Sequence, residues 1–83
     1  MKINQYFYQK VQYMTLFKVI DQIKERRKVL KVTQEMLAES SGVGLRTLKQ
    51  FESGKGNPTL TTLGEICDAL GLEITLEIKK TEP

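Results

Sequence analysis

The sequence predicts a mainly α-helical domain that ends in one β-strand. Apolar residues recur every three or four positions over most of the chain, which is the spacing of helices with one buried side. Threonines and glycines flank these segments, as they do at the starts and ends of helices. Near the C-terminus the spacing changes to every second residue, which is typical of a strand. We therefore expect a bundle of four to five short helices and a C-terminal strand.

The first predicted helix covers residues 16–30. Apolar side chains at positions 16, 19, 20, 23 and 30 share one face, and Thr15 is placed to cap the start. Arg27 falls on that same apolar face. A guanidinium at a core-facing position needs a carboxylate partner or must extend to solvent.

The segment before this helix is rich in aromatic residues. Five of the six aromatic residues of the chain lie within residues 6–17, which is too apolar for a plain disordered tail. This segment could form a helix, a second strand or a surface for a partner. Met14 could also serve as an alternative start of translation. We divide the chain into an N-terminal extension (1–14), a central domain (15–71) and a strand with a tail (72–83).

Two short helices are expected next. Thr33 is placed as the N-cap of the first, and Gly42 ends it. The second covers about residues 45–52 and follows after only three residues, so the two helices must cross steeply. Gly44 stands at its N-cap, where glycine caps less well than serine or threonine.

A fourth helix follows the turn SGKGNPT. Thr59 is placed to cap it, and Gly71 to end it. Gly64 lies inside this helix, where glycine costs about 1 kcal/mol relative to alanine. We therefore expect close packing at Gly64.

The predicted strand spans residues 72–79. Its apolar face consists of Leu72, Ile74, Leu76 and Ile78. Because an unpaired strand with an apolar face is unstable, it needs a partner strand. The simplest partner is the same strand of a second copy, which predicts a homodimer.

Composition narrows the function classes. The chain has no histidine and a single cysteine, Cys67, so we expect no metal site, no cofactor and no enzymatic activity. No apolar run reaches the roughly 20 residues of a membrane span and no secretion signal is found, so we expect a cytoplasmic protein. Residues 24–31 hold five basic residues and one acid in a chain of net charge +3. This local excess fits either an ordinary solvated face or a surface for an anionic partner, and we favour the partner.

The predicted helix at residues 45–52 has two distinct faces. Leu48 and Phe51 fall on one side at 100° per residue. The opposite side and its edge carry Arg46, Lys49, Gln50 and Leu45. These residue types suit base edges in the major groove of DNA, although so short a pattern by itself also fits an ordinary solvated face.

The wider pattern resembles the lambda-repressor and Cro-like (Xre-type) helix-turn-helix family. The resemblance rests on TQEMLAESSGVGLRTLKQFESGKGNPTLTTL (33–63) and the preceding helix, and it covers residues 16–71. It implies a lambda-repressor-like bundle that binds double-stranded DNA as a transcriptional repressor. A homodimer on a palindromic operator, in the cytoplasm or on the nucleoid of a prokaryotic cell, follows from it.

The resemblance also assigns roles to individual residues. It implies base contacts by Leu45, Arg46, Lys49 and Gln50. It implies contacts to the DNA backbone by Gln34, Thr47, Lys55, Gly56 and Asn57. It further implies an ion pair between Arg27 and Glu52.

The chain departs from the family pattern at two positions. Lys31 stands where the family usually has glycine, and a lysine at positive φ is costly, so we expect a different turn there. Gly44 stands where serine or threonine is usual, which removes a hydroxyl that would bind phosphate.

The segments LEITLEI and GKGNPTLTTL resemble, more narrowly, the Hip-type antitoxins. In that group dimers neutralise a kinase-fold toxin and repress their own operon. The narrower resemblance therefore implies an antitoxin of a toxin-antitoxin system, with a kinase-like toxin as partner. A phage-like or metabolic repressor without a toxin is the alternative.

Two other classes compete with a DNA-binding protein. A nucleotide-binding enzyme would need Gly-Lys-Ser/Thr after a strand, whereas Lys55 is followed by Gly56. A protein-interaction adaptor that does not bind DNA is suggested by the aromatic N-terminus and the lone strand. A steep fall of duplex binding with salt would distinguish a DNA-binding protein from such an adaptor.

Overall fold

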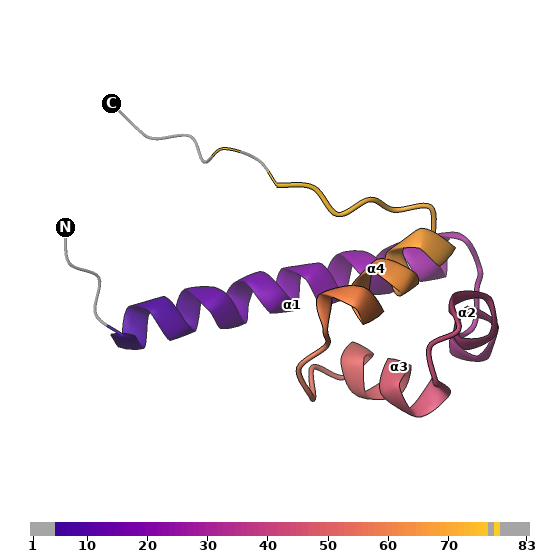
Figure 1. Ribbon diagram of the computed structural model, residues 1–83, viewed down its shortest axis with the longest axis horizontal. Helices are drawn as coiled ribbons and strands as arrows, with labels where there is room; N and C mark the ends of the chain where they lie inside the picture. Colours follow the sequence, from indigo (N-terminus) through magenta and orange to yellow (C-terminus); the bar gives the residue numbers. More distant parts are fainter. Residues whose placement is uncertain (1–4, 77, 79–83) are drawn as a thin grey trace.

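The computed structural model describes the backbone of residues 5–76 and 78, and the side chains of these ranges from residue 15 onward. The regular elements of this part are α1 (Gln5–Val29), α2 (Gln34–Ser41), α3 (Leu45–Glu52) and α4 (Leu60–Ala69). α1 runs along the length of the molecule, and the other helices gather beside its C-terminal half (Figure 1). The predicted mainly helical fold is confirmed, with four helices. None of the described helices is long and apolar enough to cross a membrane.

α1 is longer than the sequence analysis predicts. It has 25 residues, and Thr15, the predicted N-cap, lies inside it. The predicted cap is therefore wrong. No proline or glycine interrupts residues 5–29, and a threonine inside a helix costs too little to end it. Of the structures left open for the N-terminal extension, a helix is the one found from Gln5 onward.

α1 ends in a turn centred on Lys31. Lys31 has φ 57°, in the left-handed region. Its N–H donates to the Lys28 carbonyl at 3.0 Å, and the Val32 N–H donates to the Arg27 carbonyl at 3.0 Å. This is the hydrogen-bond pattern of a Schellman helix end, in which glycine usually holds the left-handed position. The lysine thus adopts the left-handed conformation itself, and the expectation of a different turn is wrong.

The connection from α2 to α3 follows the predicted caps. Thr33 Oγ1 accepts a hydrogen bond from the Met36 N–H at 3.0 Å, and Gly42, with φ 75°, ends α2. Gly44 begins α3 without a side-chain hydrogen bond. In Figure 1 α2 is seen nearly end-on whereas α3 runs across the view, so their axes are steeply inclined.

α4 is joined to α1 at its C-terminal end. Thr59 caps its start, because Oγ1 accepts from the Thr62 N–H at 3.1 Å. Gly71 follows its end with φ 69°. Arg26 of α1 donates from Nε to the Leu70 carbonyl at 3.0 Å. A cation at a helix C-terminus also interacts favourably with the helix dipole, so Arg26 stabilises the end of α4.

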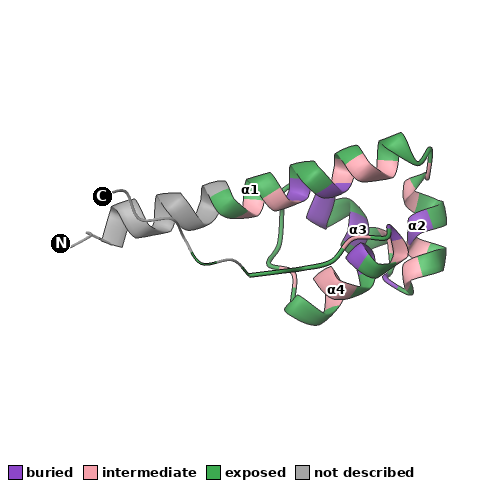
Figure 2. Cartoon of the chain, turned by 90° about the horizontal axis from the view of Figure 1, so that it is seen from above, coloured by how far each residue is buried: buried purple, intermediate pink, exposed green. Residues whose placement is uncertain are grey.

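One hydrophobic core holds the helices together. The buried segments gather where the helices meet (Figure 2). The buried members are Ile20, Ile23, Leu37, Val43, Leu48, Phe51, Ile66, Cys67 and Leu70. Burial raises the pKa of the Cys67 thiol, which therefore stays protonated and acts as a small core residue.

The C-terminal segment differs from the prediction of a strand. Residues 72–76 and 78 form no strand in this chain, and residues 77 and 79 lie outside the described part. Leu72 packs against the core, but Ile74, Leu76 and Ile78 are 45%, 98% and 98% exposed. A strand requires backbone pairing, and the described part of the single chain supplies no second strand. Ile74, Leu76 and Ile78 therefore expose apolar side chains to solvent.

Gly64 is not in close contact with a neighbouring element, so the predicted close packing at this residue is wrong. A Cβ atom built at Gly64 meets no heavy atom within 4 Å, and its backbone is not left-handed.

We expect Gly64→Ala to raise the free energy of unfolding by about 1 kcal/mol, because glycine loses more backbone entropy in a helix than alanine does. Urea unfolding measures this change. A lower midpoint for the variant would contradict the open space at this position.

Candidate nucleic-acid interface

α3 has one buried and one exposed side. Leu48 and Phe51 are 0% and 2% exposed and anchor the helix in the core. The other side carries exposed long donors, with one half-buried apolar residue at its edge: Arg46, Lys49, Gln50 and Leu45. Because the buried side fixes the rotation of α3, two cations and an amide are held together on the solvent side.

The start of α3 lacks a side-chain cap. Gly44 is the N-cap residue and makes no side-chain hydrogen bond, so the first backbone N–H groups of α3 have no capping oxygen. Thr47 is exposed on the first turn. Unpaired N–H groups at a helix start favour an anion, and here they lie on the same short helix as Arg46 and Lys49.

The loop after α3 folds back against that helix. Gly54 and Gly56 have φ 82° and 81°, a left-handed backbone that glycine adopts without strain. A groove of about 140 Å³ lies between the loop and the helix, lined by Thr47, Gln50, Phe51, Lys55, Gly56, Asn57 and Pro58. The loop residues that the resemblance assigns to the DNA backbone thus lie beside Thr47 and Gln50. The sequence carries no signal for the groove or for the part of Pro58 in it, because both depend on how the loop turns.

Arg27 and Glu52 connect α1 to the last residue of α3. Arg27 Nε donates to Glu52 Oε2 at 2.7 Å, and Nη2 donates to Oε1 at 2.8 Å. The two side chains are only 13% and 4% exposed. The hydrogen bond to Glu52 raises the pKa of Arg27, against the lowering effect of burial. The cation on the apolar face of α1 is thus held by a bidentate carboxylate.

Gln34 and the turn before α2 belong to the same network. Gln34 Nε2 donates to Glu52 Oε1 at 3.1 Å. Arg27 Nη1 donates to the Val32 carbonyl at 2.9 Å. The network therefore joins the end of α1, the start of α2 and the end of α3. The bond between Gln34 and Glu52 could not be predicted, since nothing in the spacing of these residues signals it.

Comparison with known proteins identifies the family. A model of the helix-turn-helix family matches residues 23–76, which include the end of α1 and all of α2, α3 and α4. The chain belongs to the helix-turn-helix family. The match is of the Xre, lambda-repressor-like type, and membership implies DNA binding. In this helix-turn-helix domain α2 and α3 form the motif, and α3 is the recognition helix.

Two curated relatives are regulators. The chain is similar to the cryptic phage CTXphi transcriptional repressor RstR of Vibrio cholerae, with 37% identity over 57 residues, or 69% of this chain and 51% of the repressor. It is also similar to an HTH-type transcriptional regulator of Methanothermobacter thermautotrophicus, with 45% identity over 51 residues, or 61% of this chain and 74% of that protein. The chain thus spans about half the length of the phage repressor. Proteins of the helix-turn-helix family are typically not enzymatic.

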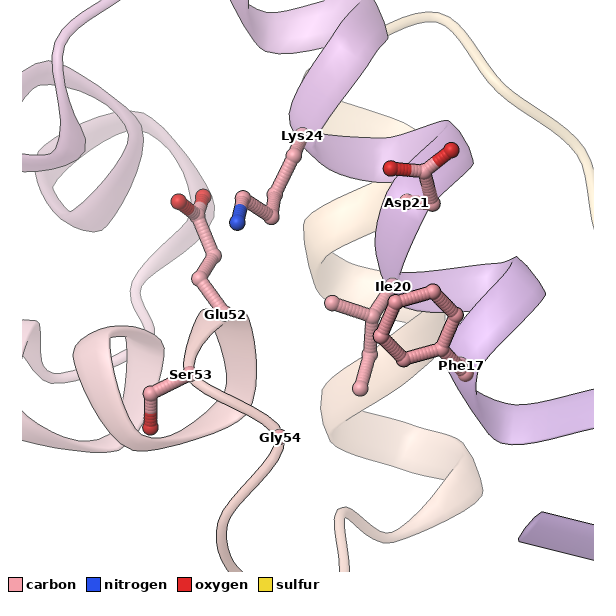
Figure 3. A pocket seen from close by; sticks show the side chains of 7 residues that line it. All are labelled: Phe17, Ile20, Asp21, Lys24, Glu52, Ser53 and Gly54. Carbon is pink, nitrogen blue, oxygen red and sulfur yellow. The ribbon is translucent and has the colours of Figure 1, made fainter. Parts of the chain in front are cut away.

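A second groove of the helix-turn-helix domain lies between α1 and the end of the recognition helix. It has a volume of about 240 Å³ and is lined by Phe17, Ile20, Asp21, Lys24, Glu52, Ser53 and Gly54. Lys24 from α1 and Glu52 from α3 point toward one another across it (Figure 3). The sequence carries no signal for this groove, because its two sides are far apart in the chain. The described residues contain no group of three or more thiol, imidazole or carboxylate side chains that would hold a metal ion.

Proposed function

We propose that this chain is a sequence-specific transcriptional repressor that inserts α3 into the major groove of its operator. The observation that carries the proposal is the amphipathic recognition helix, whose Leu48 and Phe51 are buried while Arg46 is exposed on the other side. The major groove of B-DNA is wide enough to admit such a helix. A helix fixed by its buried side and by the ion pair at Glu52 presents its donors in one orientation.

The exposed side chains match the chemistry of base edges. Arg46 and Lys49 suit guanine O6 and N7, Gln50 suits adenine N6 and N7, and Leu45 suits the methyl group of thymine. Around them, contacts to the phosphates are proposed for Gln34, Thr47, Lys55, Gly56 and Asn57. These contacts position the helix, and the base contacts supply sequence preference.

Selection of bound duplexes from a random pool is the experiment that tests this function. We expect an inverted repeat whose half-sites lie about one helical turn, roughly 34–36 Å, apart. Binding of the selected duplex should fall steeply with salt, since released counterions drive phosphate contacts. Absence of binding to any duplex at low salt would refute the proposal and favour the protein-interaction adaptor.

The proposed repressor is a homodimer that pairs its C-terminal segments as strands. Support comes from Leu76 and Ile78, which are 98% exposed although they alternate like one face of a strand. Pairing of residues 72–79 with the same residues of a second copy would cover both side chains and complete the backbone hydrogen bonds. Two-fold symmetry would then match the symmetry of a palindromic operator.

Charges on this segment should separate the two copies. We expect Leu76→Glu/Ile78→Glu to sediment at the mass of a monomer, because pairing would bury charged side chains on the apolar face of each strand. The fold of each copy should persist, since these side chains are nearly fully exposed. Thr75→Glu, on the alternate face, is the matched control and should leave the dimer intact. An undiminished dimer mass for the double variant would exclude this interface.

Two biological roles are considered for this repressor, one without a toxin and one as the antitoxin of a toxin-antitoxin pair. The likeness to a phage repressor favours a repressor without a toxin. The antitoxin role, with a kinase-like toxin as partner, rests on the C-terminal resemblance alone and stays a prediction. A kinase-fold protein that is encoded beside this chain and purifies with it would support the antitoxin role.

A further inference from the structure

Lys31 holds a conformation that a different residue would adopt more easily. It is the non-glycine residue of the described chain with positive φ, at 57°. The left-handed region places Cβ close to the following carbonyl oxygen, and glycine avoids this contact. The side chain of Lys31 is exposed, so packing in the core does not compensate for the backbone cost. Lysine at this position therefore reduces the stability of the turn.

The turn of Lys31 is linked to the recognition helix. Arg27 donates to the Val32 carbonyl at 2.9 Å and, through the same guanidinium, to Glu52 at the end of α3. The guanidinium of Arg27 thus holds both Val32, the residue after Lys31, and the end of α3. Gln34, three residues beyond Lys31, bonds to Glu52 as well. When α3 occupies the major groove, this network sets the position of the turn relative to the DNA.

Among the described residues the charge of Lys31 has no ion-pair partner. Within the described residues the ion pair is that of Arg27 with Glu52, and Lys31 has no carboxylate within ion-pair distance. Lys31 leads into the start of α2, where Thr33 caps the helix and Gln34 is a proposed phosphate contact. A free ammonium at this place adds positive charge where the helix start already favours an anion.

We propose that Lys31 is a phosphate contact of this repressor, at the turn between α1 and α2. The inference rests on the proposed function, since it assigns Lys31 to the same DNA complex. Lys31 lowers the stability of the free protein and raises the affinity of the protein for DNA. A lysine that merely occupies the surface would affect stability alone.

Lys31→Gly tests both effects in one variant. We expect the thermal midpoint of the variant to rise by about 4 °C or more, because glycine adopts the left-handed conformation without the steric cost of a Cβ atom. We expect the ratio of the affinity of the natural chain to that of the variant to be about eightfold larger in 0.1 M salt than in 1 M salt, which is the effect of one phosphate contact across a tenfold change in salt. The slope of log affinity against log salt should become shallower by about 0.9. Thermal unfolding and fluorescence anisotropy measure the two effects.

Two further variants make the test specific. Lys31→Arg keeps the charge and the left-handed backbone, so its salt slope should equal that of the natural chain. Lys18→Gln removes an exposed charge several turns upstream in α1 and should also leave the slope unchanged. An unchanged slope for Lys31→Gly would overturn the role of Lys31 while the DNA-binding function stands. Failure of the natural chain to bind any duplex would instead overturn the proposed function, and this inference with it.

Discussion

Replacing Glu52 with alanine is expected to lower the free energy of unfolding by about 3–5 kcal/mol. Removal of one partner from a buried ion pair leaves the other charge without compensation. Here Arg27 would lose both bonds of its bidentate pair in a site where its side chain is only 13% exposed. Gln34 would lose its acceptor as well. Urea unfolding followed by circular dichroism measures the loss.

The double variant Arg27→Met/Glu52→Leu is the control for this result. Apolar side chains of similar volume replace a buried ion pair at little cost in many proteins, so the double variant should recover most of the lost stability. A loss below about 1 kcal/mol for Glu52→Ala would contradict a buried role for the pair, since exposed ion pairs contribute no more than that. Equal destabilisation by the single and double variants would show that lost packing, and not an unpaired charge, explains the effect.

Replacing Arg46 with alanine is expected to cost about 1–3 kcal/mol of binding free energy on the selected operator. An arginine that bonds a guanine edge discriminates between bases, so the variant should lose its preference at particular positions of the half-site. Its unfolding free energy should change by less than about 0.5 kcal/mol, because Arg46 is exposed. Fluorescence anisotropy with the operator and with a scrambled duplex measures the two affinities.

Lys55→Ala is the matched control for Arg46→Ala. It removes one exposed cation from the loop beside the recognition helix, where the proposal places a phosphate. It should weaken binding to both duplexes alike and make the salt slope shallower by about 0.9. If Arg46→Ala also weakened both duplexes by the same factor, Arg46 would be a backbone contact and not a base contact.

Local chemistry made several helix boundaries predictable. Thr33 and Thr59 accept hydrogen bonds from backbone N–H groups of the first helical turn, and Gly42 takes the left-handed conformation that ends α2. Each of these features depends on residues only a few positions apart. The spacing of apolar residues likewise indicated which side of α3 is buried, because helix geometry alone sets that relation.

The errors arose where the local signal was weak. Thr15 has the chemistry of a cap but also fits inside a helix, and α1 continues through it to Gln5. Gly64 suggested close packing, yet the space beside it is open. In both cases the residue type permits two structures, and its chemistry alone does not distinguish between them.

Residue patterns are enough to predict the helical class, the caps of α2 and α4 and the apolar side of the recognition helix, because periodicity and capping act within a few residues. Three other features depend on the packing of the helices: the bond of Gln34 to Glu52, the guanidinium that holds both the Val32 carbonyl and α3, and the groove between Gln50 and the loop after α3. These contacts join residues distant in the chain, so they depend on how the core sets the helices against one another. The same core leaves Ile74, Leu76 and Ile78 uncovered, a property that alternation of residues does not reveal.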